Sequence, residues 1–158
     1  MPRSSVLALS SLTLVAMLVA AGASKALTFD TTHATFQKLD PSKWEHRKGS
    51  DDLWIVGDPK VPGLCIQLVN WQPGNFSHPH YHTHARYATV LSGTWWVGTG
   101  DTFDTNNMQP MPTGTFVTDL ANKVHYDGAK AETGPAIVEI VMDCPIISHS
   151  ATSGGSPE

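Results

Sequence analysis

The sequence is poor in charge and in cysteine, and both shortages narrow what the protein can be. Only 15% of its 158 residues are charged, and 10 Lys and Arg stand against 14 Asp and Glu. Nucleic acids and anionic membrane surfaces require clustered positive charge, so we expect neither as a partner. The two cysteines, Cys65 and Cys144, are too few for a framework of several disulfides. The sequence leaves open whether they form one disulfide or remain two buried thiols.

Long apolar runs are also scarce, and the one at the N-terminus has the features of an export signal. Arg3 precedes an apolar segment at about residues 6–21 that serine and threonine interrupt. This segment is shorter than the roughly 20 apolar residues of a membrane span. Small residues suited to cleavage follow it, so we predict a signal peptide over residues 1–26 and a periplasmic or secreted protein that leaves the membrane after cleavage. Loss of Arg3 and Lys25 changes the formal net charge from −4 to −6.

Long helices are not expected either, because 13 glycines and 11 prolines are spread along the chain. They separate short segments rich in β-branched and aromatic residues, which suit a pleated sheet. Segment 64–71 is apolar on both faces and should be covered on both sides, whereas 99–112 is expected to be a long loop. We predict one all-β domain over residues 27–148, a barrel or sandwich, and a disordered tail over residues 149–158. The expected strands are 34–37, 53–56, 64–71, 80–82, 87–91, 94–97, 115–118, 124–126 and 136–142.

Histidine, in contrast, is concentrated in one place. Four of the eight histidines lie within seven residues, at His78, His80, His82 and His84. Alternate residues of a strand point to the same face, so His80 and His82 can present both imidazoles to one divalent ion. A histidine-rich surface strand would explain the cluster equally well.

The surroundings of this cluster resemble the first signature motif of the cupin superfamily. That motif is written G-x5-H-x-H-x3–4-E-x6-G. Its spacing is met by Gly74, His80, His82, Arg86 and Gly93, and its glutamate is replaced by the arginine.

A partial match to the second cupin motif, G-x5-P-x-G-x2-H-x3-N, follows after a short connection. Gly114 and His125 match it, while Leu120 and Asn122 stand where the motif has proline and glycine, and the final asparagine is missing. The resemblance covers roughly residues 64–142 and is especially close to bacterial single-domain cupins of no assigned activity. It implies a cupin-type double-stranded β-helix, or jelly-roll barrel.

The resemblance also implies a ligand set. Metal-binding cupins hold one ion with two histidines and the glutamate of the first motif and the histidine of the second, which here implies His80, His82 and His125. Arg86 cannot replace the glutamate, because a guanidinium has no lone pair to donate.

Two interpretations of the missing glutamate remain open. The site is either a three-histidine centre similar to that of cysteine dioxygenase, with Arg86 binding a substrate carboxylate, or His84 is a further ligand and Arg86 turns to solvent. Tyr87 would face the ion in place of Arg86 if the strand began one residue later. The candidate metal ligands are therefore His80, His82, His84 and His125, and the candidate catalytic residues are Arg86 and Tyr87.

Cupins include dioxygenases, isomerases, epimerases, lyases and binding proteins, so the fold does not fix the reaction. Our hypothesis is an oxidoreductase of the dioxygenase kind that uses a divalent ion (Fe, Mn, Zn, Ni or Cu) and acts on a small organic acid or a phenolic compound. The alternatives are a non-catalytic periplasmic cupin that binds a small ligand, which the departures from the motifs favour, and a metal-dependent isomerase or lyase. Because cupins commonly pair through sheet edges, a homodimer is a further expectation.

Overall fold

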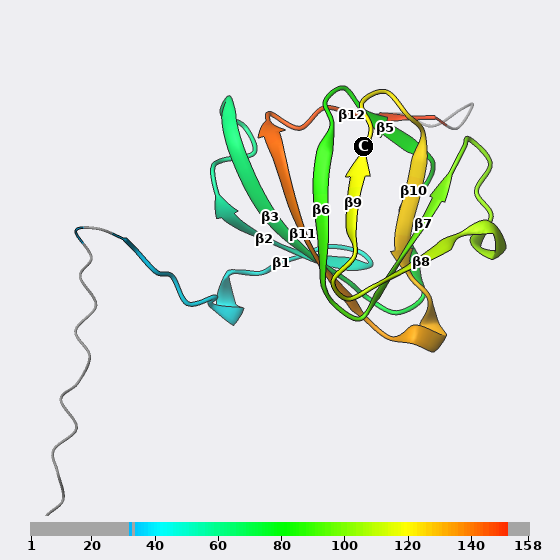
Figure 1. Ribbon diagram of the computed structural model, residues 1–158, viewed down its shortest axis with the longest axis horizontal. Coiled ribbons are helices and arrows are strands. Elements are labelled where there is room, and N and C mark those ends of the chain that lie inside the picture. Colours follow the sequence, from blue (N-terminus) through cyan, green and yellow to red (C-terminus); the bar gives the residue numbers. More distant parts are fainter. Residues whose placement is uncertain (1–31, 33, 152–158) are drawn as a thin grey trace, which may run out of the picture. The chain divides into compact units, whose positions relative to one another are not determined.

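The structure is a computed structural model that describes Thr32 and residues 34–151 (Figure 1). Leu39 begins a compact unit that includes every later described residue. The strand expected at 34–37 is wrong, because these residues are exposed and adopt no regular structure. The expected signal peptide lies outside the described residues. In the part of the chain that is described, no helix is long and apolar enough to cross a bilayer.

Sheet A contains the long apolar strands. Its order is β1-β2-β3-β11-β6-β9, and every neighbouring pair is antiparallel. The central strands β3 and β11 have nine residues each and pair along their whole length. β3 contains the segment expected to be covered on both sides, although Leu64 near its start is exposed. The bounds are β1 (Glu45–His46), β2 (Ser50–Val56), β3 (Gly63–Trp71), β6 (Arg86–Ser92), β9 (Phe116–Asp119) and β11 (Ala136–Cys144).

Sheet B contains shorter strands. Its order is β12-β5-β10-β7-β8, and β4 pairs separately with β10. All five residues of β10 are buried, including His125 and Asp127. The bounds are β4 (Asn75–Phe76), β5 (His80–His82), β7 (Thr94–Thr99), β8 (Gln109–Pro112), β10 (His125–Ala129) and β12 (Ser148–Ser150).

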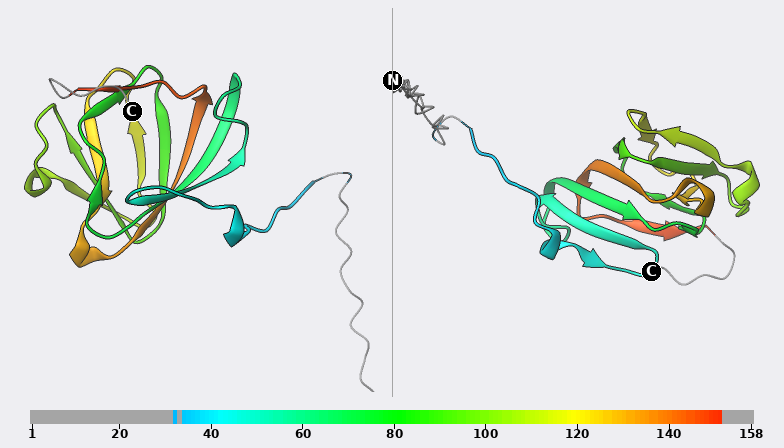
Figure 2. Two further views of the ribbon diagram at one scale, coloured as in Figure 1. Left: turned by 180° about the vertical axis from the view of Figure 1, so that it is seen from behind. Right: turned by 90° about the horizontal axis from the view of Figure 1, so that it is seen from below.

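The two sheets face each other as the walls of a barrel (Figures 1 and 2). From β5 onward the chain passes repeatedly from one sheet to the other, so that strands distant in sequence become neighbours. Three short 3₁₀ helices complete the described secondary structure, at Pro41–Lys43, Thr105–Asn107 and Ala131–Thr133. The prediction of an all-β fold is therefore confirmed.

The apolar core lies between the sheets and comes mainly from the inner face of sheet A. In β11, Ala136, Val138, Ile140 and Met142 are at most 4% exposed, whereas the residues between them are not buried. This period of two is that of a strand with one face in the core, and each fully buried aliphatic side chain contributes about 1.5–3 kcal/mol. A disulfide joins Cys65 of β3 to Cys144 of β11, which answers the question that the sequence left open.

Two expectations at the edges of sheet B are corrected. Residues 109–112 form β8 inside the expected loop, and its prolines are tolerated because an edge strand such as this one pairs on one side only. The expected tail begins too early, since His149 and Ser150 belong to β12 and pair with β5. Residues 152–158 lie outside the described residues.

Candidate metal centre

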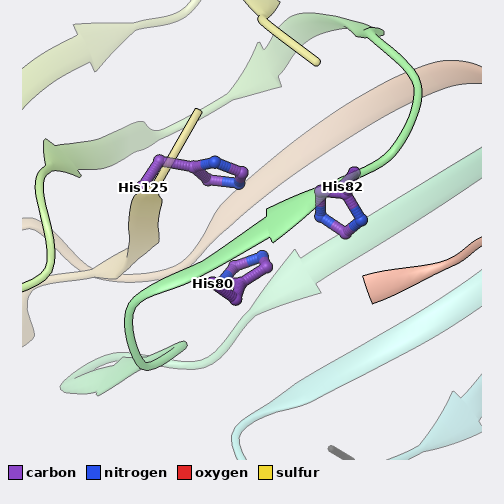
Figure 3. Close-up of side chains that lie close together, drawn as sticks. All are labelled: His80, His82 and His125. Carbon is purple, nitrogen blue, oxygen red and sulfur yellow. The ribbon is translucent and has the colours of Figure 1, made fainter. Parts of the chain in front are cut away.

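Two neighbouring strands of sheet B bring three histidines together. His80 and His82 lie on the same face of β5 because alternate residues of a strand point the same way. His125 begins β10, and the register of the two strands sets it directly opposite His80. One ring nitrogen of each histidine lies within 4.8 Å of the other two (Figure 3). Among the described residues, these three form the group of side chains close enough together to hold a metal ion.

The hydrogen bonds of these rings leave lone pairs of His80 and His82 without a protein donor among the described residues, whereas His125 Nε2 lies 3.2 Å from Arg86 Nη2. His80 Nδ1 lies 2.7 Å from the carbonyl oxygen of His78, and His125 Nδ1 lies 3.0 Å from that of Lys123. A carbonyl can only accept, so both rings carry their proton on Nδ1 and have a lone pair on Nε2. Both ring nitrogens of His82 are buried without a hydrogen-bond partner. Because such orphaned polar atoms are costly, the three rings fit a bound metal that would satisfy them.

Burial keeps two of these imidazoles neutral. Burial lowers the pKa of His82 to about 3, and the positive charge of Arg86 adds to the effect. Burial also lowers the pKa of His80, against the opposing charge of Asp127. Neutral imidazole is the form that binds metal, so both rings are ready to do so at physiological pH.

Arg86, at the position of the motif's glutamate, points into the barrel and is held by Asp119. The two residues are direct cross-strand partners on β6 and β9. Arg86 Nε and Nη2 donate to Asp119 Oδ2 over 2.7 and 2.6 Å, and the side chains are only 13% and 9% exposed. Arg86 Nη2 also lies 3.2 Å from His125 Nε2. The arginine is therefore a buried cation that contacts one of the three histidines.

Asp119 also supports His125 directly. Its Oδ1 lies 3.0 Å from His125 Nδ1, in the arrangement by which carboxylates orient metal-binding histidines. Burial opposes both charges, but the hydrogen bond between the two groups raises the pKa of His125 and lowers that of Asp119, and Arg86 lowers the latter further. Asp119 thus fixes the ring of His125 and the guanidinium of Arg86 together.

A second buried carboxylate, Asp127, shares the inner face of β10 with His125. Trp95 Nε1 donates to its Oδ2 over 3.1 Å, and Ser77 Oγ donates to its Oδ1. The Ser77 N–H donates to the carbonyl oxygen of Asp127, and the Asp127 N–H donates to Ser77 Oγ, which fastens the segment just before His80 to β10. Asp127 therefore positions the start of the histidine strand.

The other candidate residues lie elsewhere. His84 is exposed, its Nδ1 lies 3.2 Å from Thr83 Oγ1, and it is not one of the grouped histidines. Tyr87 is 48% exposed and stacks on Phe116, on the face of β6 opposite to Arg86. This placement corrects the expectation for Tyr87: the strand begins at Arg86, and so Arg86 is the residue that points inward. His78 is exposed and contributes its carbonyl oxygen to His80.

A small cavity lies beside the histidines. It is a shallow hollow, partly open to solvent, and His82, Arg86 and His84 contribute to its wall. The segments 83–85 and 145–147 supply most of the remaining lining. A small molecule in this cavity would thus meet one of the three histidines and the buried guanidinium.

Comparisons with known proteins identify the fold. No protein-family model matches the sequence, and no curated protein is similar to it. The polyketide cyclase RemF from Streptomyces resistomycificus is similar in structure, with a TM-score of 0.60 and 12% identity over 73% of this chain and 85% of that chain. An uncharacterized conserved protein from Klebsiella pneumoniae with a double-stranded β-helix domain has a TM-score of 0.57 and 16% identity, over 80% of this chain and 99% of that one.

A cupin 2 domain-containing protein from Halorhodospira halophila is also similar, with a TM-score of 0.53 and 19% identity over 65% of this chain and 70% of that chain. The chain has the cupin fold. At these identities the likeness establishes the fold alone, and the site has to be argued from its own residues.

Sequence reasoning missed both buried carboxylates of this cupin barrel. Asp119 lies one residue beyond the expected strand 115–118, and its pairing with Arg86 depends on a cross-strand register that the sequence does not reveal. Asp127 did carry a signal, because it lies two residues after His125 and so on the same face of the strand.

Proposed function

We propose that this cupin binds a divalent transition metal through His80, His82 and His125 and is a metal-dependent enzyme. One observation carries the proposal: three largely buried imidazoles from two strands converge, with their nitrogen lone pairs uncommitted to protein donors except at His125. When bound, the ion would supply a Lewis acid with open coordination positions. The nitrogen donor set suits Fe, Zn, Ni and Cu better than it suits Mg or Ca.

We propose a small organic acid or a phenolic compound, ionised in the site, as the substrate. Arg86 is the buried cation at the edge of the cavity, and its planar guanidinium matches a carboxylate. The small size of the cavity favours a compact substrate. In this function the histidines hold the ion, Asp119 orients His125, and Arg86 binds and orients the anion.

Metal content is the first test of the proposal. Protein purified without chelators should contain stoichiometric metal by elemental analysis, and His80→Ala, His82→Ala and His125→Ala should each lose it. His149→Ala is the matched control, because His149 lies on β12 beside β5 and stacks on Tyr81 away from the site. Metal retained in His80→Ala, or lost equally in His149→Ala, would contradict the assignment.

The reaction class requires a second test. We propose an oxidoreductase of the dioxygenase kind, since three protein ligands leave room on the ion for both a substrate and oxygen. Metal-loaded protein should then consume oxygen in the presence of one member of a panel of small carboxylates and phenols. Product formation without oxygen uptake would instead indicate an isomerase, lyase or cyclase. The similarity in fold to RemF, a polyketide cyclase, is a reason to include ring-closing substrates in the panel.

One contact favours a second candidate function, a non-catalytic barrel that binds a small anion without metal. Arg86 Nη2 engages His125 Nε2, so one of the three lone pairs already has a partner when no ion is bound. Under this alternative, metal-stripped protein gains thermal stability with carboxylates and added metal does not increase the gain.

We also propose that the protein is exported. The apolar N-terminal segment is typical of a signal peptide, and the disulfide between Cys65 and Cys144 suits an oxidising compartment. Fractionation of cells that express the full chain, followed by mass analysis of the product, tests this. A cytosolic product that retains residues 1–26 would refute it.

A further inference from the structure

Arg86 occupies the place where a metal ion would approach His125. The Nδ1 proton of His125 is directed at Lys123 and Asp119, so the lone pair available for an ion is on Nε2. Arg86 Nη2 lies 3.2 Å from that nitrogen, and a guanidinium can only donate. A metal ion and Arg86 therefore compete for the same lone pair, and their charges repel.

The guanidinium of Arg86 is held by Asp119 along one edge and has a free donor nitrogen on the other side. Asp119 binds Nε and Nη2, while Nη1 has no hydrogen-bond partner within the described residues. Arg86 also lines the cavity, together with His82 and His84. An anion in the cavity thus has a donor of Arg86 to bind that does not have to leave Asp119.

The net charge of the metal-bound site favours the binding of such an anion. The charged groups that act on the histidines are Arg86, Asp119 and Asp127: Arg86 and Asp119 neutralise each other, and Asp127 adds one negative charge near His80 and His125. A divalent ion on neutral imidazoles would still leave one uncompensated positive charge in a largely buried site, since no carboxylate ligand takes the place of the motif's glutamate. A carboxylate between the ion and Arg86 would reduce this excess.

We propose that Arg86 is a gate that closes the empty metal site and that a small carboxylate opens it. In the empty state Arg86 caps His125; when a carboxylate binds in the cavity, the guanidinium turns to it and releases Nε2 to the ion. Metal and carboxylate then bind cooperatively, and because linkage is reciprocal each tightens the other by the same factor. This inference rests on the proposed metal site and adds to it the regulation of that site by its ligand.

Zinc binding tests the gate without any enzymatic assay. Zinc is redox-inert, and its affinity for metal-stripped protein can be measured by competition with a coloured chelator, in acetate and in chloride of equal ionic strength. Acetate should tighten zinc binding to the wild type several-fold. Arg86→Met should bind zinc about 10-fold tighter than the wild type in chloride, because the competing charged hydrogen bond is gone. Acetate should tighten zinc binding to Arg86→Met much less than it tightens zinc binding to the wild type.

Two variants make the comparison specific. Arg47→Met removes an arginine from another buried carboxylate, Asp52, to which Arg47 Nε is bonded over 2.9 Å, and it should behave like the wild type toward zinc and acetate. Arg86→Met combined with Asp119→Asn leaves no unpaired buried carboxylate. This double variant replaces Arg86→Met in the experiment if the single variant folds poorly. Acetate should tighten its zinc binding much less than it tightens zinc binding to the wild type.

The outcomes separate the gate from the metal site. Acetate that bound only as a zinc ligand would act equally on the wild type and on Arg86→Met, and that result would overturn the gate while leaving the metal site intact. Zinc binding by Arg86→Met that is no tighter than that of the wild type would also overturn it. If the folded wild type binds no zinc in either salt, the proposed function itself fails.

Discussion

Sheet A and sheet B bury different kinds of side chain. Nine of the eleven residues in the hydrophobic core cluster come from β3, β6 and β11 of sheet A, whereas sheet B contributes Trp95 and Ala129. Sheet A also contains both cysteines of the disulfide. Sheet A also buries two polar residues, Asp52 and Gln67, whereas sheet B buries His82, His125 and Asp127, on strands of three and five residues.

The difference indicates that one wall of the barrel supplies most of the stability and the other supplies most of the chemistry. Buried polar groups cost free energy unless they are paired, so a sheet that contains them needs a stable support. Sheet A supplies Arg86 and Asp119 to the site, and those two residues neutralise each other. The following predictions test this division, from the largest expected effect to the smallest.

Removal of the disulfide should weaken sheet A without damaging the site. The Cys65→Ala, Cys144→Ala double variant opens a covalent loop spanning 79 residues, so we expect a loss of about 4 kcal/mol in the free energy of unfolding, measured in urea. Zinc affinity should stay within about threefold of the wild type, a change worth less than 1 kcal/mol. A large loss of zinc affinity in the folded variant would show that the two sheets are not independent.

Metal should stabilise the molecule through sheet B. At a free zinc concentration of about 100 times the dissociation constant, the wild type should gain about 2.7 kcal/mol. His125→Ala should gain far less, and this is measured by urea unfolding with and without zinc. An equal gain in both proteins would mean that zinc binds somewhere else.

Acid should destabilise the metal-free protein through His82. Its pKa of about 3 lies below the ordinary value of 6.5, so between these values the unfolded state binds more protons and stability falls as pH falls. From about pH 7 to about pH 5 this contributes a loss of up to about 2 kcal/mol. His125 has the opposite effect on the pH dependence of stability, because its pKa is raised in the folded state. The stability that His125 contributes is fully present below pH 6.5 and is lost as the pH rises through the folded-state pKa.

The difference between the wild type and His82→Leu isolates the effect of His82. Urea unfolding across this pH range should show a smaller loss of stability toward acid in His82→Leu than in the wild type. Identical pH dependence in the two proteins would mean that His82 is not desolvated in the folded state.

A carboxylate at position 86 should tighten the site. Arg86→Glu restores the glutamate of the cupin motif but would set two carboxylates opposite each other, so it is best combined with Asp119→Asn. We expect zinc to bind this double variant about 10-fold tighter than it binds Arg86→Met combined with Asp119→Asn, or about 1.4 kcal/mol, by competition with a chelator. Affinity at or below that of Arg86→Met combined with Asp119→Asn would show that a carboxylate at position 86 does not reach the ion.

The sequence was most informative where local pattern decides the structure. The strands that overlap expected ones are β2, β3, β5, β6, β7, β9, β10 and β11, because their β-branched and aromatic residues alternate or run between turns. β8 was missed because its prolines look like loop residues until the edge position of the strand is known. β12 was missed because three residues with serine at both ends carry no strand signal of their own, and pairing with β5 alone makes them a strand.

The candidate site likewise contains some residues that the sequence could predict and others that it could not. The three histidines that the structure brings together were predicted from their spacing and from the cupin motifs. The roles of Asp119 and Arg86 depend on which residue of β9 lies opposite which residue of β6, and a shift by one would turn either side chain to the outer face. For the same reason the sequence could not decide between Arg86 and Tyr87.

The short strand β12 makes the site convenient to observe. Ser148 lies opposite His82 and Ser150 lies opposite His80, and Ala151 donates its N–H to the carbonyl oxygen of Pro79. His149 points to the outer face, where it stacks on Tyr81. A fluorophore or spin label attached at position 149 would therefore sit one strand away from two candidate ligands without entering the barrel, and its signal would report changes in β5 as they occur.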